Sequence, residues 1–233
     1  MPNGNAHAFA ALLRAGRWFA ALPAPFQALL LDHGAVRAVA EGERLFSRGD
    51  APNGLFAVVE GAVRVTASSE AGKEALLTLM EPPAWFGEIS LFDGQPRTHD
   101  AVGNEPSRVI QVPQRALEDA LLANPAWWRE LGLLVTSKLR LAFVALEDAA
   151  VVSLPTRLAR RLVQMAEGYG EWLDRSRRVL AVRQEELALM LSTSRQTVNQ
   201  LMKELEHKGW VRLSYGQVEL VDLDALKAAA RRD

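Results

Sequence analysis

Short apolar segments alternate with turn residues over the first half of the chain. Most of the turns contain glycine, which supplies the positive φ that a tight turn demands. Strands at this regular spacing predict an all-β sandwich or barrel. The predicted strands are Val36–Val39, Leu45–Phe46, Leu55–Val59, Val63–Ala67, Ala75–Met80 and Val109–Val112.

The apolar spacing becomes helical after these strands. A short helix is predicted over Arg115–Leu122, and Asn124 is placed to cap a long helix with Pro125 at its first position. Apolar residues recur on this helix at intervals of three and four: Leu131, Val135, Leu139, Ala142, Leu146 and Ala149. Such a stripe pairs with a second helix as in a coiled coil. The alternative is that it packs only on its own β-domain.

A pair of short helices around a tight turn is predicted between Arg183 and Trp210. Leu187, Met190 and Leu191 give the first helix an apolar side. Thr193 is predicted to cap the second helix, with Gln196 closing a capping box. The inner face of that helix holds Val198, Leu201, Met202 and Leu205. Beyond it, two apolar runs around Ser214-Tyr215-Gly216-Gln217 predict a β-hairpin.

The outer face of the second helix carries side chains that can contact DNA. Arginine matches the O6/N7 edge of guanine, glutamine and asparagine match the N6/N7 edge of adenine, and lysine suits phosphates. The alternative is an ordinary solvated face, but such faces are rich in Glu and Lys. The residue types and the hairpin that follows therefore favour a winged helix-turn-helix. The candidate DNA-binding residues are Arg183, Gln184, Ser194, Arg195, Gln196, Thr197, Asn199, Gln200 and Lys203.

The run Ser194-Arg195-Gln196-Thr197-Val198, followed by a hairpin, resembles the DNA-binding end of CRP/FNR bacterial transcription regulators. The usual family pattern is Ser-Arg-Glu-Thr-Val, so Gln196 replaces a glutamate. Glutamate accepts a hydrogen bond from cytosine, whereas glutamine both donates and accepts. The operator of this protein is therefore expected to differ from the family norm.

The segment from Phe86 to Thr98 resembles the phosphate-binding cassette of cyclic-nucleotide-binding β-rolls. A glycine lets backbone N–H groups approach an anion, a glutamate accepts a sugar hydroxyl, and an arginine presents a planar fork to phosphate. The candidate effector-binding residues are Gly87, Glu88, Ile89, Ser90, Arg97 and Thr98. The alternative is that Glu88 and Arg97 pair and tie together a cassette that binds no effector.

Two departures from the family pattern concern the effector. Asp100 follows the cassette and would add negative charge near a bound phosphate. Members that respond to cAMP place a Thr-Ser pair on the central helix, and counting back from Arg157 puts Ala142 and Phe143 at those positions. The phosphate end of the pocket therefore matches, and the base end does not. Arg97→Ala is expected to abolish any response with folding retained.

Composition excludes several other classes of protein. The 233 residues contain no cysteine, which removes disulfides, thiolate catalysis and cysteine-ligated iron–sulfur clusters. The four histidines are scattered, so neither a metal site nor a catalytic site is expected. No apolar run approaches a membrane span, and a cytoplasmic location is expected. The formal charge is −1, with a small basic excess from Val151 onward.

The expected fold class is α+β: an N-terminal double-stranded β-helix, a long dimerisation helix and a C-terminal winged helix-turn-helix. The expected domains are residues 1–123, 124–153 and 154–233. The expected function is a DNA-binding regulator, not an enzyme. It would act as a parallel homodimer on an inverted repeat of double-stranded DNA, with RNA polymerase as a further partner and a cyclic nucleotide as candidate effector. The alternatives are an effector-independent regulator, or a nucleotide-binding module without DNA function.

Overall fold

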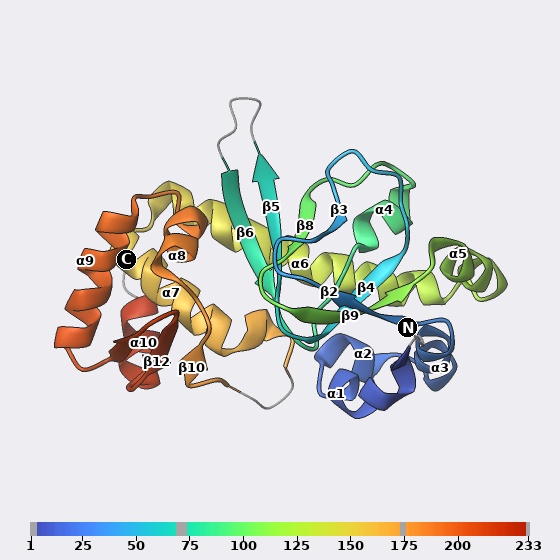
Figure 1. Ribbon diagram of the computed structural model, residues 1–233, viewed down its shortest axis with the longest axis horizontal. Coiled ribbons are helices and arrows are strands. Elements are labelled where there is room, and N and C mark those ends of the chain that lie inside the picture. The colour runs from blue at the N-terminus through green and yellow to red at the C-terminus, as the bar shows by residue number, and fades with distance from the viewer. Residues whose placement is uncertain (1–3, 69–73, 173–175, 232–233) are drawn as a thin grey trace. The chain divides into compact units, whose positions relative to one another are not determined.

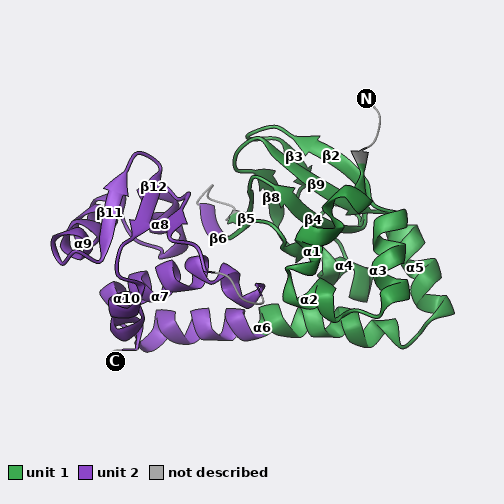
Figure 2. Cartoon of the chain, turned by 90° about the horizontal axis from the view of Figure 1, so that it is seen from below, with its two compact units in different colours: residues 1–73, 77–139 green, residues 74–76, 140–233 purple. Residues whose placement is uncertain are grey.

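The computed structural model describes residues 4–68, 74–172 and 176–231. The chain forms two compact units (Figure 2). Unit 1 comprises residues 1–73 and 77–139, and unit 2 comprises residues 74–76 and 140–233. Each unit has its own apolar core, as expected for a chain of this length.

Unit 1 is a roll of two antiparallel sheets, as the alternating pattern predicted (Figure 1). The first sheet has the strand order β1 (Gly4–Asn5), β2 (Ala35–Val39), β9 (Ser107–Val112), β4 (Leu55–Glu60), β7 (Trp85–Phe86). The second has the order β3 (Arg44–Phe46), β8 (Asp100–Gly103), β5 (Val63–Ser68), β6 (Glu74–Met80). The six predicted strands are all present, within two residues at each end. Strands β1, β7 and β8 were not predicted.

Short N-terminal helices cover one side of the roll. They are the 3₁₀ helix η1 (Ala6–Phe9) and the helices α1 (Ala10–Arg14), α2 (Arg17–Ala21) and α3 (Ala24–Asp32). Their apolar side chains join those of the first sheet in one core. In this core Trp85 stacks on Phe19 at 5.6 Å between ring centroids, and Phe26 stacks on Trp127 at 4.7 Å. A second core lies on the other side of the sheet, around Phe56.

The long helix α6 runs from Trp127 to Val151, after α5 (Gln114–Ala123). The prediction that Asn124 caps it with Pro125 as first residue was wrong. Asn124 is instead the C-cap of α5, and its side-chain amide donates to the carbonyl of Ala120 at 3.4 Å. The Asn-Pro pair therefore ends one helix and forms a turn before the next.

The apolar stripe predicted along α6 divides between two surfaces. Leu131 is fully buried in the core of its own roll, together with Leu134, and this contradicts its place on an exposed stripe. Leu139 and Leu146 remain 51% and 66% exposed, and Phe143, which was not in the predicted stripe, is 61% exposed. Leu131 and Leu134 in the first turns of α6 thus pack on the roll, and Leu139, Phe143 and Leu146 form an exposed apolar surface further along the helix.

Unit 2 contains two helices that flank a helix-turn-helix and a small sheet. The helices are α7 (Leu154–Ala166) and α10 (Leu223–Ala230). Between them lie the 3₁₀ turn η2 (Gly168–Gly170), β10 (Val179–Leu180), α8 (Gln184–Met190), α9 (Arg195–His207), β11 (Val211–Ser214) and β12 (Gln217–Leu220). The core of the unit includes Leu158, Leu162, Leu187 and Met202, all less than 2% exposed.

An arginine on α7 joins three helices of unit 2. The Nη1 atom of Arg160 forms an ion pair with the carboxylate of Asp148 on α6, and its Nε donates to the carbonyl of Ala230 at 2.6 Å. Asp148 is only 8% exposed. A charge removed from water to this degree is stable in the fold only when it is paired, so these contacts fix the packing of the three helices.

Candidate functional site

The second helix of the helix-turn-helix begins at a cap one residue later than predicted. Ser194, not Thr193, is the N-cap: its Oγ accepts a hydrogen bond from the backbone N–H of Thr197 at 3.0 Å. The two hydroxyls also lie 2.8 Å apart. Because Ser194 caps the helix through its bond to Thr197, α9 begins at Arg195.

The predicted faces of α9 are confirmed except at Leu201 on the inner face and Asn199 on the outer face, which are both half-buried. Val198 and Met202 are fully buried, and Leu205 is 8% exposed. The side chains exposed on the opposite face are Arg195, Gln196, Gln200 and Lys203. The N-terminal residues of a recognition helix are the ones that reach base edges in helix-turn-helix complexes. Arg195 and Gln196 hold that position.

Two of the predicted DNA-binding residues bond to each other. The amide of Asn199 donates to Oε1 of Gln184 at 2.7 Å, and this bond joins α9 to the first turn of α8. Both side chains are half-buried. They therefore hold the two helices together, and the exposed part of the predicted face is smaller than the sequence indicated. Arg183 is exposed at the N-cap of α8, where its backbone N–H donates to Glu186.

The predicted hairpin is present and forms the wing. Ser214 pairs with Gln217, so its turn consists of Tyr215 and Gly216, and Gly216 has a φ of +69°. The side chain of Tyr215 is fully exposed at this tip. Strand β10 adds a third strand beside β12, which the sequence did not indicate because it is only two residues long.

The cassette in unit 1 has the short helix α4 (Glu88–Asp93), which Gly87 precedes in a left-handed conformation, φ +94°. A Cβ at Gly87 would lie 3.0 Å from both Nη1 of Arg97 and the carbonyl oxygen of Gly54. Glycine is thus required here for conformation and for space. Glu88 and Ser90 are each 3% exposed, whereas Ile89 is 42% exposed and Thr98 bonds to the ring of His99.

Arg97 is buried, and its guanidinium is bound by the protein itself. Nη1 donates to the carbonyl of Gly87 at 2.7 Å, and Nη2 donates to Oδ1 of Asn53 and the carbonyl of Gly54, both at 2.6 Å. The group also lies 4.4 Å from the ring centre of Phe46. Burial lowers the pKa of Arg97, while Glu88 and Asp50 oppose that change.

The partner of Glu88 is a lysine of the long helix that the sequence pattern did not reveal. Nζ of Lys138 lies 2.8 Å from Oε2 of Glu88 and donates to the carbonyl of Trp85 at 2.6 Å. The alternative in which Glu88 pairs with Arg97 is therefore corrected. No local pattern could have revealed this partner, because Lys138 is fifty residues from Glu88.

Asp100 also bonds to partners within the protein. It forms an ion pair with Arg44 at 3.1 Å and accepts a hydrogen bond from the backbone N–H of Arg48 at 2.8 Å. It therefore holds β8 to β3 and the loop after β3, a structural role for a residue that the sequence treated only as a charge near a phosphate.

His99, beside the cassette, is expected to make stability depend on pH. Burial and the positive charge of Arg48 lower the pKa of His99 below its ordinary value of 6.5, and Asp100 opposes them. Below pH 6.5 the unfolded chain then binds a proton that the folded chain does not bind, so stability falls as the pH drops through this range. Urea unfolding at pH 7.5 and 5.5 measures the loss, and His99→Gln should reduce it. An equal loss in the variant contradicts this role.

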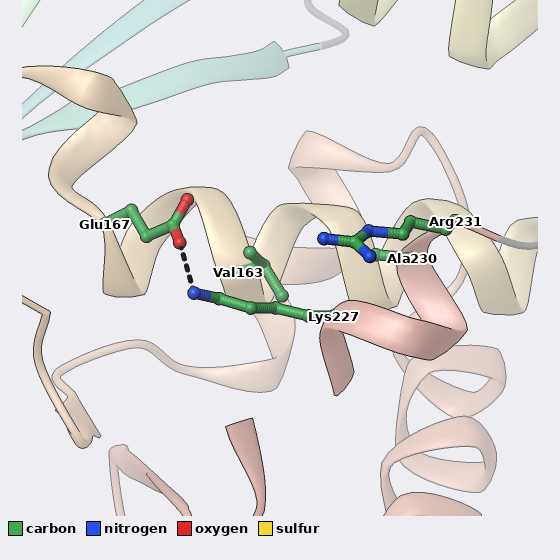
Figure 3. Close-up of a pocket in the computed structure, with 5 residues that line it drawn as sticks. All are labelled: Val163, Glu167, Lys227, Ala230 and Arg231. Carbon is green, nitrogen blue, oxygen red and sulfur yellow. Dashed lines mark ion pairs between the residues drawn. The ribbon is translucent and has the colours of Figure 1, made fainter. Parts of the chain in front are cut away.

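A shallow recess of unit 2 lies between α7 and α10 (Figure 3). In it Lys227 points toward Glu167 and forms an ion pair with it at 2.8 Å. The recess is lined by Val163, Glu167, Lys227, Ala230 and Arg231. None of the predicted site residues lies in this lining, so the recess is separate from both candidate sites.

Metal-binding groups and membrane spans are both absent from residues 4–68, 74–172 and 176–231. Within these ranges, no group of three or more histidine, aspartate or glutamate side chains is arranged to hold a metal ion. In the same part of the chain, every helix is too short or too polar to cross a bilayer.

Comparison with known proteins identifies both parts of the chain. Residues 36–124 match the family described as the cyclic nucleotide-binding domain, and residues 156–229 match the Crp-like helix-turn-helix domain. The CRP-like cAMP-activated global transcriptional regulator of Mycobacterium tuberculosis is 31% identical over 191 residues, which cover 82% of this chain and 85% of that protein.

Solved structures agree with this assignment. A CRP/FNR-family transcriptional regulator from Thermus thermophilus is 28% identical, with a TM-score of 0.67 over 84% of this chain and 98% of that one. FixK2 from Bradyrhizobium japonicum shares the fold, with a TM-score of 0.76 at 19% identity, over 86% of this chain and 98% of its own. The chain belongs to the CRP/FNR family of DNA-binding transcription regulators.

Proposed function

We propose that this regulator is a homodimer that binds an inverted-repeat operator in double-stranded DNA. The observation that carries the proposal is the exposed Arg195 and Gln196 at the capped start of α9. Two such helices in a dimer would enter successive major grooves about 34 Å apart. Residues 1–123, 124–153 and 154–233 would serve as effector-type roll, dimer helix and DNA-binding domain.

The individual residues would have different roles at the DNA. Arg195 would bind a guanine edge with two hydrogen bonds, and Gln196 an adenine edge. Lys203, about two helical turns further along, would contact a phosphate. Ser194, Thr197, Asn199 and Gln184 would hold the helices in position, while Gln200 and Arg183 would lie at the margin of the contact. Tyr215 at the wing tip is a further candidate for a backbone contact.

Selection of operators from random double-stranded DNA, followed by gel shifts, tests this function. We expect a recovered consensus with two inverted half-sites separated by one helical turn. Recovery of no specific sequence, with only salt-sensitive binding to all DNA, would favour the alternative of a nucleotide-binding or interaction module. A consensus without inverted symmetry would reject the twofold homodimer and leave DNA recognition in place.

The dimer would form along the exposed face of α6. Leu139, Phe143, Leu146 and Ala150 follow one another at intervals of four, three and four, which is the spacing of a coiled-coil seam. The first three are exposed by 51%, 61% and 66%. A surface of this kind on one subunit is self-complementary when a parallel twofold copy meets it.

Phe143→Lys should convert the dimer to monomers, because two lysines would face each other in an apolar seam. Sedimentation velocity measures the change, and binding to the full inverted repeat should fall at least tenfold. Ala145→Lys is the matched control, since Ala145 is also exposed on α6 but lies about 200° around the helix from Phe143. A Phe143→Lys protein that stays dimeric rejects this seam.

Other partners follow from this function. RNA polymerase is the expected protein partner of a bound regulator, and the cytoplasm its expected location. We expect no enzymatic activity, because neither the sequence nor the arrangement of the described residues offers a nucleophile with its base.

A cyclic nucleotide is the first effector to test, since the Mycobacterium tuberculosis relative is named as activated by cAMP.

A further inference from the structure

Helix α6 contains an interior glycine that the packing of its own subunit does not require. Apart from proline, glycine is the least favourable residue in a helix interior. Outside its own helix, the nearest described atom to a Cβ built on Gly132 is Cζ of Phe92, at 3.9 Å, which is an ordinary van der Waals contact. An alanine would therefore fit in the subunit and favour the helix. A glycine is useful at this position if another backbone approaches it closely from outside the subunit.

Gly132 lies on the line of the proposed seam. From Leu139, intervals of four, three and four residues lead back to Val135, Gly132 and Trp128. This is the spacing that the seam shows after Leu139, and none of these side chains carries a charge. The distance between two packed helices depends on the side chains at the contact, so a glycine on this line allows a close approach.

Helix α4 borders the same line with two large apolar side chains. Phe92 contacts the ring of Trp128 edge-on, at 5.1 Å between ring centroids. Ile89 precedes Phe92 by three residues, so both lie on one face of α4. Ile89 is 42% exposed and Phe92 46% exposed. Neighbouring exposed apolar side chains of this size mark a surface that a partner covers.

We propose that α4 and the first turns of α6 form a second part of the dimer interface, in which α6 of a second copy lies against Gly132, Ile89 and Phe92. The occupant is a second copy because this surface continues the uncharged line of the seam. A parallel twofold copy would present the same line at the same level. The inference rests on the proposed function, since it extends the proposed dimer. Helix α4 also begins with Glu88, so the candidate effector site and the dimer contact would share one short helix.

Cysteine cross-linking tests the position of Gly132. The chain contains no cysteine, so a single introduced cysteine can form a disulfide only between two copies. Gly132→Cys should link at least half of the chains on mild oxidation, measured on a non-reducing gel, because equivalent seam positions face each other. Ser137→Cys is the matched control, since Ser137 is exposed about 140° around the same helix, and it should link less than a tenth. Equal linking of the two variants, or linking of neither, overturns the proposal.

A charge on α4 tests the second surface. Phe92→Lys should weaken the dimer at least tenfold in sedimentation equilibrium, while Phe92→Leu, which stays apolar, should remain within about threefold of the wild type. Leu122→Lys is the matched control, because Leu122 is an apolar side chain of the same unit that is 76% exposed on α5. Ile89→Lys provides the same test if Phe92→Lys does not fold.

The outcomes separate this inference from the proposed function. Wild-type dimer affinity in the folded lysine variants of α4 contradicts the second surface and leaves the seam from Leu139 onward in place. An equal loss in Leu122→Lys also contradicts it, because the effect would then not be specific to α4. A wild-type protein that is monomeric at all concentrations rejects the homodimer itself.

Discussion

Replacing Arg195 by alanine should weaken binding to the matched operator by about 1–3 kcal/mol for each half-site, which is roughly 5- to 150-fold per half-site. The guanidinium is exposed at the first position of α9, so its loss leaves the fold unchanged and removes one two-bonded contact to a base. Competition binding to the matched operator and to variants at each base pair measures the effect. Discrimination should disappear at one position of each half-site and remain at the others.

Lys203→Ala is the control for the charge of Arg195. Lys203 is exposed on the same helix, and a lysine that contacts phosphate contributes equally to all sequences. This variant should weaken all operators alike and lower the salt dependence by about one counterion per subunit. If Arg195→Ala shows the same uniform loss with an unchanged base preference, then Arg195 contacts the DNA backbone and the assigned base contact is wrong.

Arg97→Ala should destabilise unit 1 by about 3 kcal/mol, contrary to the sequence expectation that folding would be unaffected. The substitution leaves the carbonyls of Gly54 and Gly87 and the amide oxygen of Asn53 without a donor. Each buried polar group without a partner costs about 1–3 kcal/mol, and the losses overlap because one side chain serves all three. Urea unfolding followed by tryptophan fluorescence measures the change, since Trp85 lies in the core of the same unit.

Two further variants show whether the loss of stability comes from the hydrogen bonds of Arg97. Arg97→Lys keeps the positive charge but not the planar fork, so an intermediate loss is expected. Arg129→Ala removes an arginine that is 74% exposed and should cost less than about 1 kcal/mol. If Arg97→Ala unfolds at the same urea concentration as Arg129→Ala, the three hydrogen bonds contribute nothing to stability and Arg97 has no structural role.

The DNA-binding half could be predicted from the sequence because its signals are local. The stripe of Val198, Met202 and Leu205 specifies which face of α9 is buried, and the Tyr215-Gly216 turn specifies the hairpin. The exact cap could not be resolved. Thr193 and Ser194 are adjacent and chemically equivalent as caps, and only the backbone conformation decides which hydroxyl reaches the N–H of Thr197.

The bonding of the cassette could not be predicted, because its partners are distant in the sequence. Lys138 is fifty residues from Glu88, and Asn53 is 44 residues from Arg97. The residue types at Gly87, Glu88 and Arg97 were informative about chemistry, but the same types serve a bound phosphate or an internal network equally well. Which of these forms depends on long-range packing, and a single sequence does not encode packing in any local pattern.

The long helix shows a similar limit to prediction from the sequence. Helical spacing alone joined Leu131 and Leu139 in one stripe, although Leu131 is buried in its own roll and Leu139 is half exposed. An ideal helix turns by about 100° per residue, so a stripe that is read over many turns drifts from one neighbour to another. Lys138 lies between the buried Leu134 and the half-exposed Leu139, so the change from core residues to exposed residues falls next to it.

The contacts of Arg160 connect α10 to the C-terminal part of α6. Because a single guanidinium binds both Asp148 and the carbonyl of Ala230, segments 82 residues apart should open together in native-state amide exchange, as one cooperative block. An extension or fusion attached after α10 would therefore perturb the end of α6 as well as α10, because Arg160 bonds to both. In evolution, changes near Ala230 and at Asp148 are consequently expected to constrain each other.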